Sequence, residues 1–302
     1  MYQPTVNAIV VTYNRRKLLE ECVAAICDQT YPISKTYIVN NKSTDGTNEY
    51  LDTLDKGRFS VFNAEQNLGG AWGFEQGVRL NEQDGNYDLL LLIDDDAILD
   101  KNCILNIVKE AEKHANAEAF SATVIEHGEI NTGHRKRIDK GFKARFVPIP
   151  AKEYEKESFR VDLASFCGLV VKSSIVKKIG FPRGDFFIWY DDTEYSLRIR
   201  RHSTIINANK ALLFHRTKVQ VQDPNASVWK TYYGERNFTV VRRKYFPAIS
   251  NLLAIGRKIA TAVKLTLTGK RAGKYRLGNL LLNAYWDGLR GKLGKNDKYL
   301  PG

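Results

Sequence analysis

The sequence predicts an α/β protein with a mainly parallel sheet that helices cover on both faces. Short apolar segments alternate with amphipathic segments along the N-terminal third of the chain, and this alternation is typical of strand–helix units with parallel strands. The chain has 302 residues, 43% of them hydrophobic, which is enough for one large domain with a buried core and a smaller appendage.

The predicted elements follow one another in a regular order. Residues 6–13 (VNAIVVTY) form the first strand, and apolar positions from Leu18 to Ile26 then recur with helical spacing. Further strands are predicted over 36–39, 59–62 and 87–93, with helices near 48–54 and within the glycine-rich segment 67–80. Because ligands bind beyond the carboxyl ends of parallel strands, the loops after these strands should share one edge of the sheet.

The second half of the chain is less regular. Residues 127–154 are polar, basic and rich in turn-forming residues, and we expect a loop or excursion over the sheet. A second ordered block starts at Val161, with a helix predicted over 191–201 and a strand over 211–215. From Trp229 onward the pattern is helical, so we expect a catalytic domain over 1–228 and a helical basic C-terminal region over 229–302.

The net charge of +12 belongs to this C-terminal region. From Arg242 onward there are fourteen Lys or Arg and two acids, whereas the rest of the chain is balanced. Residues 247–290 alternate apolar with basic positions, and a basic turn is predicted at 270–276. A basic amphipathic helix fits the surface of an anionic leaflet, and packing on the catalytic domain or on a second subunit is the alternative. No recognised nucleic-acid motif accompanies the charge, so we expect no nucleic-acid partner.

Cysteine usage and the N-terminal sequence indicate the compartment. Four scattered cysteines do not form a disulfide framework, and the first residues do not resemble a secretory signal. The apolar stretches are too short to span a bilayer. We therefore expect a cytoplasmic protein, peripheral at the cytoplasmic membrane.

Three consecutive carboxylates, Asp94, Asp95 and Asp96, end the strand predicted over 87–93. Like charges at the end of a buried strand are costly unless a cation compensates them. Asp94 and Asp96 should point to the same side, since side chains alternate along extended backbone, and their oxygens suit Mg²⁺ or Mn²⁺. A solvated acidic turn before a helix near Asp100 is the alternative.

A second acidic group, Trp189-Tyr190-Asp191-Asp192-Thr193-Glu194, opens the helix predicted over 191–201. Acids at a helix start also serve as ordinary capping groups. A carboxylate beside an aromatic side chain is nevertheless suited to taking a proton from an attacking hydroxyl, and Asp192 is our candidate base. Asp191 and Glu194 are candidates for binding acceptor hydroxyls, and Glu194 is alternatively placed to pair with Arg198.

Two further features depend on their surroundings. His215 ends an apolar strand and would reach the same sheet edge, although an isolated histidine is more often structural. The segment from Asn67 to Gly73 has glycines before a helix, which permit close approach to a phosphate or sugar, but it also fits a tight turn.

Five motifs together resemble glycosyltransferase family 2. They are VVTYNR, VNNKSTDGT, NLGG-x-x-GF, LLLIDDDA and WYDDTEYSLR, in this order. The resemblance covers about residues 5–245 and implies the GT-A fold. More narrowly, the chain resembles the bacterial galactofuranosyltransferases. The resemblance implies an inverting transfer in which a metal stabilises a UDP leaving group.

The resemblance also assigns roles to residues. Asp94, Asp96 and His215 would hold the metal, and Asp192 would be the base. Trp189 is a candidate for the acceptor site beside Asp191 and Glu194. The residues implied in binding the nucleotide sugar are Thr12, Tyr13, Asn14, Asn40, Asn41, Asn67, Gly69, Gly70, Trp72, Asp94 and Asp95. Asn41 or Asn40 stands where many relatives have an aspartate that bonds the uracil.

The sequence leaves several readings of function open. We expect transfer of galactofuranose from UDP-galactofuranose to a lipid-linked or polysaccharide acceptor, and a rhamnosyltransferase using dTDP-rhamnose is the nearest alternative. An inactive carbohydrate-binding or scaffolding relative would have little reason to keep both acidic groups. A nucleotidyltransferase would need a basic glycine-rich first loop, which this chain does not have. A homo-oligomer is compatible with the sequence.

Overall fold

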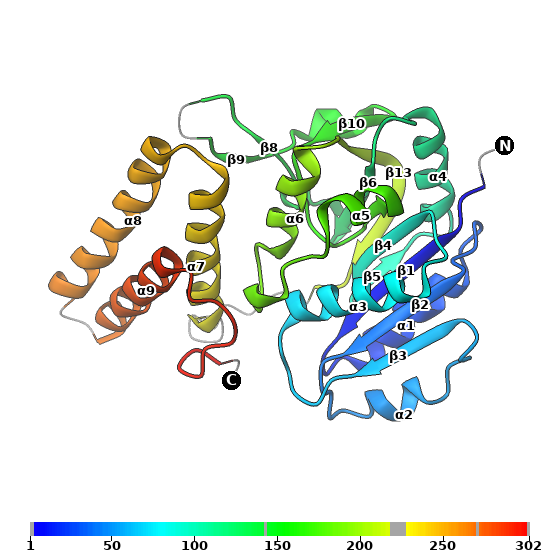
Figure 1. Ribbon diagram of the computed structural model, residues 1–302, viewed down its shortest axis with the longest axis horizontal. Coiled ribbons are helices and arrows are strands. Elements are labelled where there is room, and N and C mark those ends of the chain that lie inside the picture. The colour runs from blue at the N-terminus through cyan, green and yellow to red at the C-terminus, as the bar shows by residue number, and fades with distance from the viewer. Residues whose placement is uncertain (1–2, 142–143, 218–227, 270–271, 301–302) are drawn as a thin grey trace.

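The computed structural model describes residues 3–141, 144–217, 228–269 and 272–300, and its centre is a large mixed sheet. The strand order is β10-β13-β6-β12-β4-β1-β2-β3, with β5 paired to β13 and β7 paired to β6. Figure 1 shows this sheet with helices on both sides. The predicted α/β class with a mainly parallel sheet flanked by helices is confirmed.

The parallel half of the sheet carries the predicted N-terminal strands. It consists of β1 (Val6–Thr12), β2 (Lys35–Asn40), β3 (Phe59–Asn63) and β4 (Leu89–Asp94). All three neighbouring pairs in this half are parallel. Their carboxyl ends therefore meet at one edge of the sheet, as the sequence predicts.

The other half of the sheet mixes directions. It contains β6 (Ala119–Glu126), β10 (Ser158–Val161), β12 (Leu169–Lys172) and β13 (Ile205–His215). β12 runs antiparallel to β4 and β6, whereas β13 runs parallel to β6. β13 begins six residues before the strand predicted over 211–215, and its far end pairs with the short β5 (Ala97–Leu99).

The loop predicted over 127–154 is more ordered than expected. β7 (Glu129–Ile130) folds back on β6, and a turn of 3₁₀ helix (Thr132–His134) leads into β8 (Arg135–Ile138). With β9 (Phe146–Pro148) and β11 (Leu163–Ala164), β8 forms a second, three-stranded sheet. The buried guanidinium of Arg135 bonds the carbonyls of Ala122 and Cys167. A charged residue thus serves as an internal brace, which polar composition alone does not reveal.

Helices cover the two faces of the large sheet. On one face lie α1 (Arg16–Cys27), α2 (Thr47–Leu51) and α4 (Cys103–Lys113), whose apolar residues pack with Ala8 and Val10. On the other lie α3 (Gly70–Asp84), α5 (Ser173–Ile179) and α6 (Asp191–Arg200), which pack with Ile9. Alternate residues of β1 therefore enter different cores, as expected for a strand buried on both faces.

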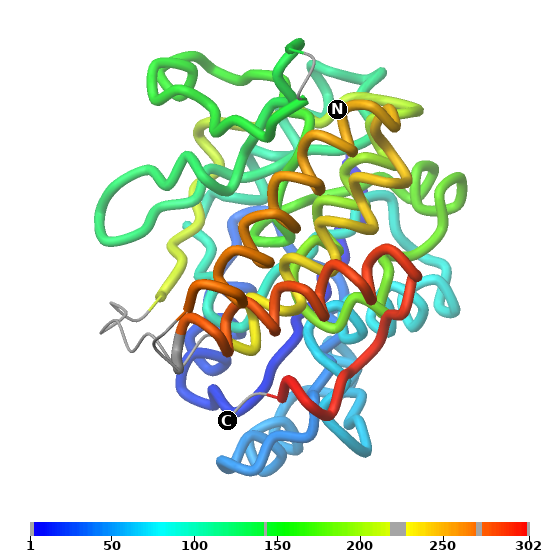
Figure 2. Tube along the Cα trace, turned by 90° about the vertical axis from the view of Figure 1, so that its left-hand side faces the viewer, coloured from blue at the N-terminus to red at the C-terminus, as the bar shows by residue number. Residues whose placement is uncertain are grey.

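Three C-terminal helices lie beside this sheet, as Figures 1 and 2 show. They are α7 (Val228–Tyr245), α8 (Ala248–Thr268) and α9 (Ala272–Arg290). The basic turn predicted at 270–276 lies partly outside the described residues, and its Lys274 and Arg276 belong to α9. Tyr232 and Tyr233 of α7 pack with Phe187 and with Leu280 of α9, so these helices share a core with the loop before α6.

Bilayer crossing is not indicated by the described helices. Within the residues that the structure describes, none of them combines the required length with sufficient apolar character.

Candidate active site

The loops after β1, β2 and β4 meet at the edge where the sequence predicts a site. Val11 stands opposite Asp94 in register, and Thr12 stands opposite Asn40. The acidic triplet thus lies beside the loop that follows β1, and the predicted grouping of Thr12, Asn40 and Asp94 at one edge is observed.

Asp95 faces the loop after β1. Its carboxylate accepts hydrogen bonds from the Thr12 hydroxyl at 2.7 Å and from the Tyr13 backbone N–H at 3.4 Å. Arg15 also donates to it at 3.1 Å. Burial raises the pKa of Asp95 to about 6, whereas Arg15 and the Thr12 hydroxyl act to lower it. Asp95 therefore shapes the first loop, while the Tyr13 side chain beside it stays exposed.

Asp94 and Asp96 differ in their surroundings. Burial, with the neighbouring charges of Asp96 and Asp95, raises the pKa of Asp94 to about 7. Asp96 is also buried, but contacts with His215 and Arg15 outweigh its burial and lower its pKa. The Arg15 guanidinium lies 2.5 Å from Asp96 Oδ2 and also contacts Asp95. A single arginine therefore compensates part of the charge of the triplet.

His215 is brought to the acidic triplet by the pairing of β13 with β5. His215 stands opposite Ala97 in this ladder, and its Nε2 atom lies 3.2 Å from Asp96 Oδ1. Its Nδ1 atom lies 2.6 Å from Glu126 Oε1. Burial opposes the charged imidazole, but Asp96 and Glu126 outweigh it and raise the pKa of His215 to about 9.

The donor atoms fit a divalent metal. Asp96 Oδ1 is buried, and among the described residues no donor meets it with hydrogen-bond geometry. Its separation of 3.2 Å from His215 Nε2 is close to the distance of about 3 Å between neighbouring ligands of one octahedral ion. Two carboxylates and an imidazole suit Mn²⁺ or Mg²⁺ with places left for phosphate oxygens.

Glu126 and His134 complete this cluster and were not predicted. His134 Nε2 lies 3.0 Å from Glu126 Oε1, and His134 Nδ1 lies 2.8 Å from Ser165 Oγ. Together with His215, they offer three ligand atoms within 4.8 Å of one another. Burial, followed by Arg135, lowers the pKa of His134 to about 4, so this imidazole is neutral. Sequence spacing gave no signal here, because β6, β7 and the turn after them must fold before these side chains meet.

The glycine-rich loop packs directly on the loop before α6. Gly69 has φ +86°, and a Cβ at this position would lie 2.0 Å from the carbonyl oxygen of Phe187. Around Gly70, the first residue of α3, a Cβ would meet nothing within 4 Å. Gly69 is therefore required for packing, whereas Gly70 borders open space at a helix N-terminus, where backbone N–H groups favour an anion.

The asparagines predicted to bind nucleotide hold these loops together. Asn41 donates to the Gly69 carbonyl at 2.9 Å, and Asn67 accepts from the Gly69 N–H at 2.9 Å. Asn40 is buried and donates to Asn48 and Asn63. These side chains bond to other groups of the protein. The predicted hydrogen bond from Asn40 or Asn41 to a base stays a prediction.

The remaining predicted donor-site residues border the same loops. Asn14 adopts φ +52° and accepts a hydrogen bond from Thr44 N–H at 2.7 Å. Trp72 is partly exposed on α3, and its ring lies 6.0 Å from that of Phe62.

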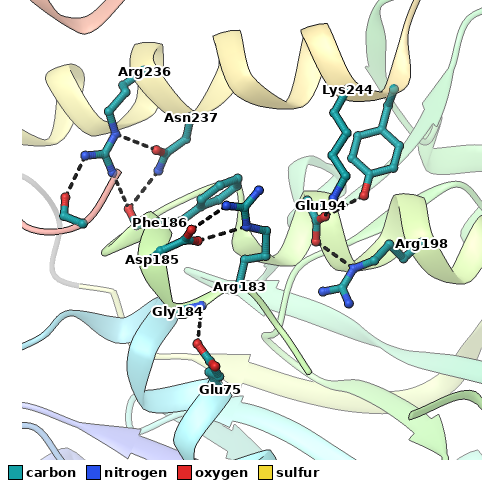
Figure 3. A network of polar contacts seen from close by, with 12 residues as sticks. Glu75, Arg183, Gly184, Asp185, Phe186, Glu194, Arg198, Arg236, Asn237 and Lys244 are labelled. Carbon is teal, nitrogen blue, oxygen red and sulfur yellow. Dashed lines mark hydrogen bonds and ion pairs between the residues drawn. The ribbon is translucent and has the colours of Figure 1, made fainter. Parts of the chain in front are cut away.

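A buried polar pair on α7 holds the loop before α6, as Figure 3 shows. The Asn237 amide donates to the carbonyls of Phe186, Ile188 and Trp189 at 3.0, 2.9 and 2.9 Å. Arg236 donates to the Phe186 carbonyl at 3.0 Å and to the Gly294 carbonyl at 2.7 Å. These bonds fix a segment in which Phe187, Trp189 and Tyr190 all have positive φ. Such conformations cost about 1–3 kcal/mol each and persist only when surrounding contacts hold them.

Asp191 and Asp192 follow this segment directly. Burial, the charge of Asp192 and the charge of Asp94 raise the pKa of Asp191 well above its usual range. Burial also raises the pKa of Asp192, which accepts hydrogen bonds from Thr193. Trp189 beside them is 48% exposed, so its ring is available to a ligand.

Glu194 has the second of its two predicted roles. It pairs with Arg198 at 2.9 Å, and it also accepts from Lys244 at 2.9 Å and from the Tyr245 hydroxyl at 2.6 Å. With 1% exposure it does not reach an acceptor, so the structure assigns it to anchoring α6 on α7.

Comparison with known proteins bears on the family and the fold of this chain. Residues 8–180 match the sequence profile of the family described as Glycosyl transferase family 2. A 96-residue stretch is 33% identical to the putative teichuronic acid biosynthesis glycosyltransferase TuaG of Bacillus subtilis, covering 31% of this chain and 37% of TuaG. A 110-residue stretch is 28% identical to glycosyltransferase GlyG of Streptococcus pneumoniae, covering 36% and 35%. The matches thus span little more than a third of these relatives.

Solved structures share the fold over nearly the whole chain. GalNAc-T7 with UDP, GalNAc and Mn²⁺ matches with a TM-score of 0.64 and 14% identity, covering 96% of this chain and 56% of that protein. TarS of S. aureus in complex with UDP-GlcNAc matches with a TM-score of 0.62 and 15% identity, covering 95% and 81%. At these identities the similarity establishes the fold alone, and that fold is GT-A.

Proposed function

The chain belongs to glycosyltransferase family 2, and we propose that it is an inverting, metal-dependent enzyme that transfers a hexose to a hydroxyl of a cell-surface glycan precursor. The observation that supports this proposal most directly is the approach of His215 Nε2 to Asp96 Oδ1 at 3.2 Å. This pair lies beside Asp94, at the sheet edge where the donor-binding loops meet.

In this proposal Asp94, Asp96 and His215 hold Mn²⁺ or Mg²⁺. The ion, when bound, neutralises charge on the diphosphate leaving group. Gly70 and the N-terminus of α3 face the diphosphate, and Arg15 is near enough to exchange its contact with Asp96 for one with a phosphate oxygen. Trp72 and the Asn67–Gly69 turn border the donor sugar.

Asp192 takes the acceptor proton in this proposal. As the acceptor hydroxyl oxygen forms a bond to the anomeric carbon, the bond to the nucleoside diphosphate breaks and the proton moves to the Asp192 carboxylate. Burial raises the pKa of this carboxyl and so makes it a stronger base. Trp189 offers an exposed ring against which an acceptor sugar can stack.

For the donor, we propose UDP-galactofuranose. The glycine-rich loop NLGGAWGF and the pair Asp191-Asp192 resemble the galactofuranosyltransferase pattern. A rhamnosyltransferase using dTDP-rhamnose is the second candidate, because it would use the same sheet edge and metal site.

For the acceptor, we propose a lipid-linked or polysaccharide hydroxyl at the inner leaflet of the cytoplasmic membrane. The name of TuaG places that relative in teichuronic acid biosynthesis, which fits a role in surface glycan assembly. Residues 229–302 would form the region that contacts the membrane, and a second subunit is the alternative partner.

Calorimetric titration tests this function. UDP, dTDP, UDP-galactose and UDP-galactofuranose are each titrated with and without Mn²⁺. We expect metal-dependent UDP binding and a preference for the furanose donor. Tighter binding of dTDP would favour rhamnosyl transfer, and absence of binding by every nucleotide would contradict the proposal.

A further inference from the structure

A groove lies between α7, α8 and the segment that enters β9. It has a volume of about 310 Å³. The side chains that matter most are Arg145 and Phe146 from the β9 side, Phe238 and Arg242 from α7, and Leu253 and Arg257 from α8. None of the residues that contribute to the donor or metal site lines this groove.

The groove combines an apolar lining with positive charge. Its described lining contains three arginines and no carboxylate. Arg242 is buried and bonds the Ala144 carbonyl and the Ser250 hydroxyl, so it braces the wall. Arg145 pairs with Asp139. Arg257 is exposed, and no described residue forms an ion pair with it, which leaves its guanidinium available to an anion.

The groove opens onto an apolar stripe along α8. The stripe consists of Ile249, Leu252, Leu253, Val263 and Leu267, whose exposures run from 38% to 80%. These positions recur with helical spacing, so they lie on one face of the helix. Figure 2 shows α8 crossing the outer side of the molecule. Leu253 belongs to both features, and the stripe therefore continues into the groove.

The groove lining also contacts the segment that precedes α6. The Phe238 ring meets the Tyr190 ring edge-on at a centroid distance of 6.0 Å. Tyr190 immediately precedes Asp191 and Asp192. One aromatic contact thus separates the groove lining from the residues proposed to bind and deprotonate the acceptor.

We propose that this groove binds the lipid that carries the acceptor, namely its phosphate and the first part of its apolar chain. Arg257, assisted by Arg145, contacts the phosphate, and Phe146, Phe238 and Leu253 contact the chain. The stripe enters the leaflet beside the lipid, as exposed apolar residues flanked by cations do. The inference rests on the proposed function and specifies the acceptor class and its site.

The charge of the groove favours a lipid over a second copy of this chain. A twofold contact through this face would place equivalent surfaces against each other, so the arginines of one copy would approach those of its partner. An anionic headgroup instead complements them, and a free phosphate would leave the apolar lining exposed to water.

Vesicle flotation tests the proposal on the full chain. Phosphatidylcholine vesicles containing polyprenyl phosphate are compared with vesicles containing the uncharged polyprenol and with vesicles containing phosphatidylglycerol. We expect the wild-type chain to prefer polyprenyl phosphate over both. Arg257→Gln should reduce this preference about tenfold, the effect of losing one hydrogen bond between the guanidinium and the phosphate. Lys264→Gln is the matched control, since Lys264 is an exposed cation of α8 outside the groove.

The outcomes separate a groove from general charge attraction. Equal losses of vesicle binding in Arg257→Gln and Lys264→Gln would overturn the proposal. So would equal wild-type binding to vesicles with phosphatidylglycerol and to vesicles with polyprenyl phosphate. A dimer that buries the stripe, and whose light scattering Arg257→Gln does not change, would also overturn it. Metal-dependent UDP binding is measured on the same samples. If it persists while the lipid preference is absent, the groove assignment fails and the proposed glycosyltransferase function does not.

Discussion

The Nε2 atom of His215 faces Asp96 because Glu126 accepts a hydrogen bond from Nδ1 of the same ring at 2.6 Å. A carboxylate on one ring nitrogen fixes the tautomer and orientation in which the other nitrogen serves as a ligand. His134 and Asn131 in turn hold Glu126. We therefore regard Glu126 as a positioning residue for the metal site.

Glu126→Gln should weaken the Mn²⁺-dependent affinity for UDP by about 10–100-fold, the usual cost of losing such a partner. Isothermal titration with UDP in the presence and absence of Mn²⁺ measures this change. Glu129→Gln is the matched control, because Glu129 is exposed on the adjacent β7. Wild-type affinity in Glu126→Gln would show that His215 is oriented without it.

Asp192→Asn should reduce turnover by about 10²–10⁴-fold, the contribution of a general base, because an amide cannot take the acceptor proton. UDP binding in the presence of Mn²⁺ should remain near the wild-type level. Asp185→Asn provides a control in the same segment, where the carboxylate forms a partly exposed pair with Arg183. Normal turnover in Asp192→Asn would remove this residue from the base role.

Neighbouring glycines should respond differently to alanine. In Gly69→Ala the new Cβ would collide with the Phe187 carbonyl, and φ +86° is unfavourable for alanine. We expect a loss of stability of several kcal/mol, roughly that of other large backbone conflicts. Gly70→Ala meets no atom within 4 Å, so the protein should keep its thermal midpoint while UDP affinity falls. Equal melting temperatures for both variants would contradict this packing argument.

Asn237→Ala tests the coupling between α7 and the loop before α6. The substitution removes the Asn237 donor from the carbonyls of Ile188 and Trp189, whereas the Phe186 carbonyl keeps its bond from Arg236, and each buried unsatisfied group costs about 1–3 kcal/mol. Relaxation of the strained segment should lower turnover and thermal stability together, with UDP affinity less affected. Thr261→Ala on the exposed side of α8 is a suitable control. Unchanged turnover would show that the segment keeps its shape without Asn237.

The parallel strands and the acidic triplet were predictable because their signals are local. A β-branched apolar run determines β1 and a run of leucines determines β4, whose last residue is Asp94. The position of His215 beside the triplet was anticipated from its place at a strand end, and its metal-binding role stays a prediction of the family resemblance. In these cases the residue stands at or directly after the end of its strand, so a local pattern places it at the sheet edge.

The supporting residues were not predictable for a physical reason. Glu126 and His134 meet His215 only after β7 folds back on β6. Arg135, in a basic run that indicates an exposed loop, is buried because backbone carbonyls of Ala122 and Cys167 surround it. Asn237 acts through backbone carbonyls, which have no sequence signature. Each of these contacts depends on tertiary pairing rather than on local pattern.

The C-terminal helices also affect how the membrane hypothesis can be tested. Deleting residues 247–302 would remove Leu280 and Tyr299 from the core that contains Phe187 and Tyr232. The truncated chain should therefore unfold near the loop before α6. A charge on the exposed stripe avoids this problem. Leu267→Asp, at a side chain with 80% exposure, should reduce binding to anionic vesicles without changing the thermal midpoint. Undiminished vesicle binding would exclude α8 from the contact.

Acid stability should depend on Glu194. Burial acts to raise its pKa, but Arg198, Tyr245 and Lys244 outweigh burial and lower the pKa from its ordinary value of 4.5. A carboxyl with a lowered folded-state pKa stabilises the fold above its unfolded pKa, and this stabilisation is lost as pH falls through the folded-state pKa. The difference in urea midpoint between wild type and Glu194→Gln should therefore be constant near neutral pH and shrink below about pH 4.5.

Glu20→Gln, in an exposed pair with Arg16, should show little difference at any pH, because exposed pairs contribute about 0–1 kcal/mol. If the wild-type and Glu194→Gln curves stay parallel into acid, the carboxylate of Glu194 is not what joins α6 to α7.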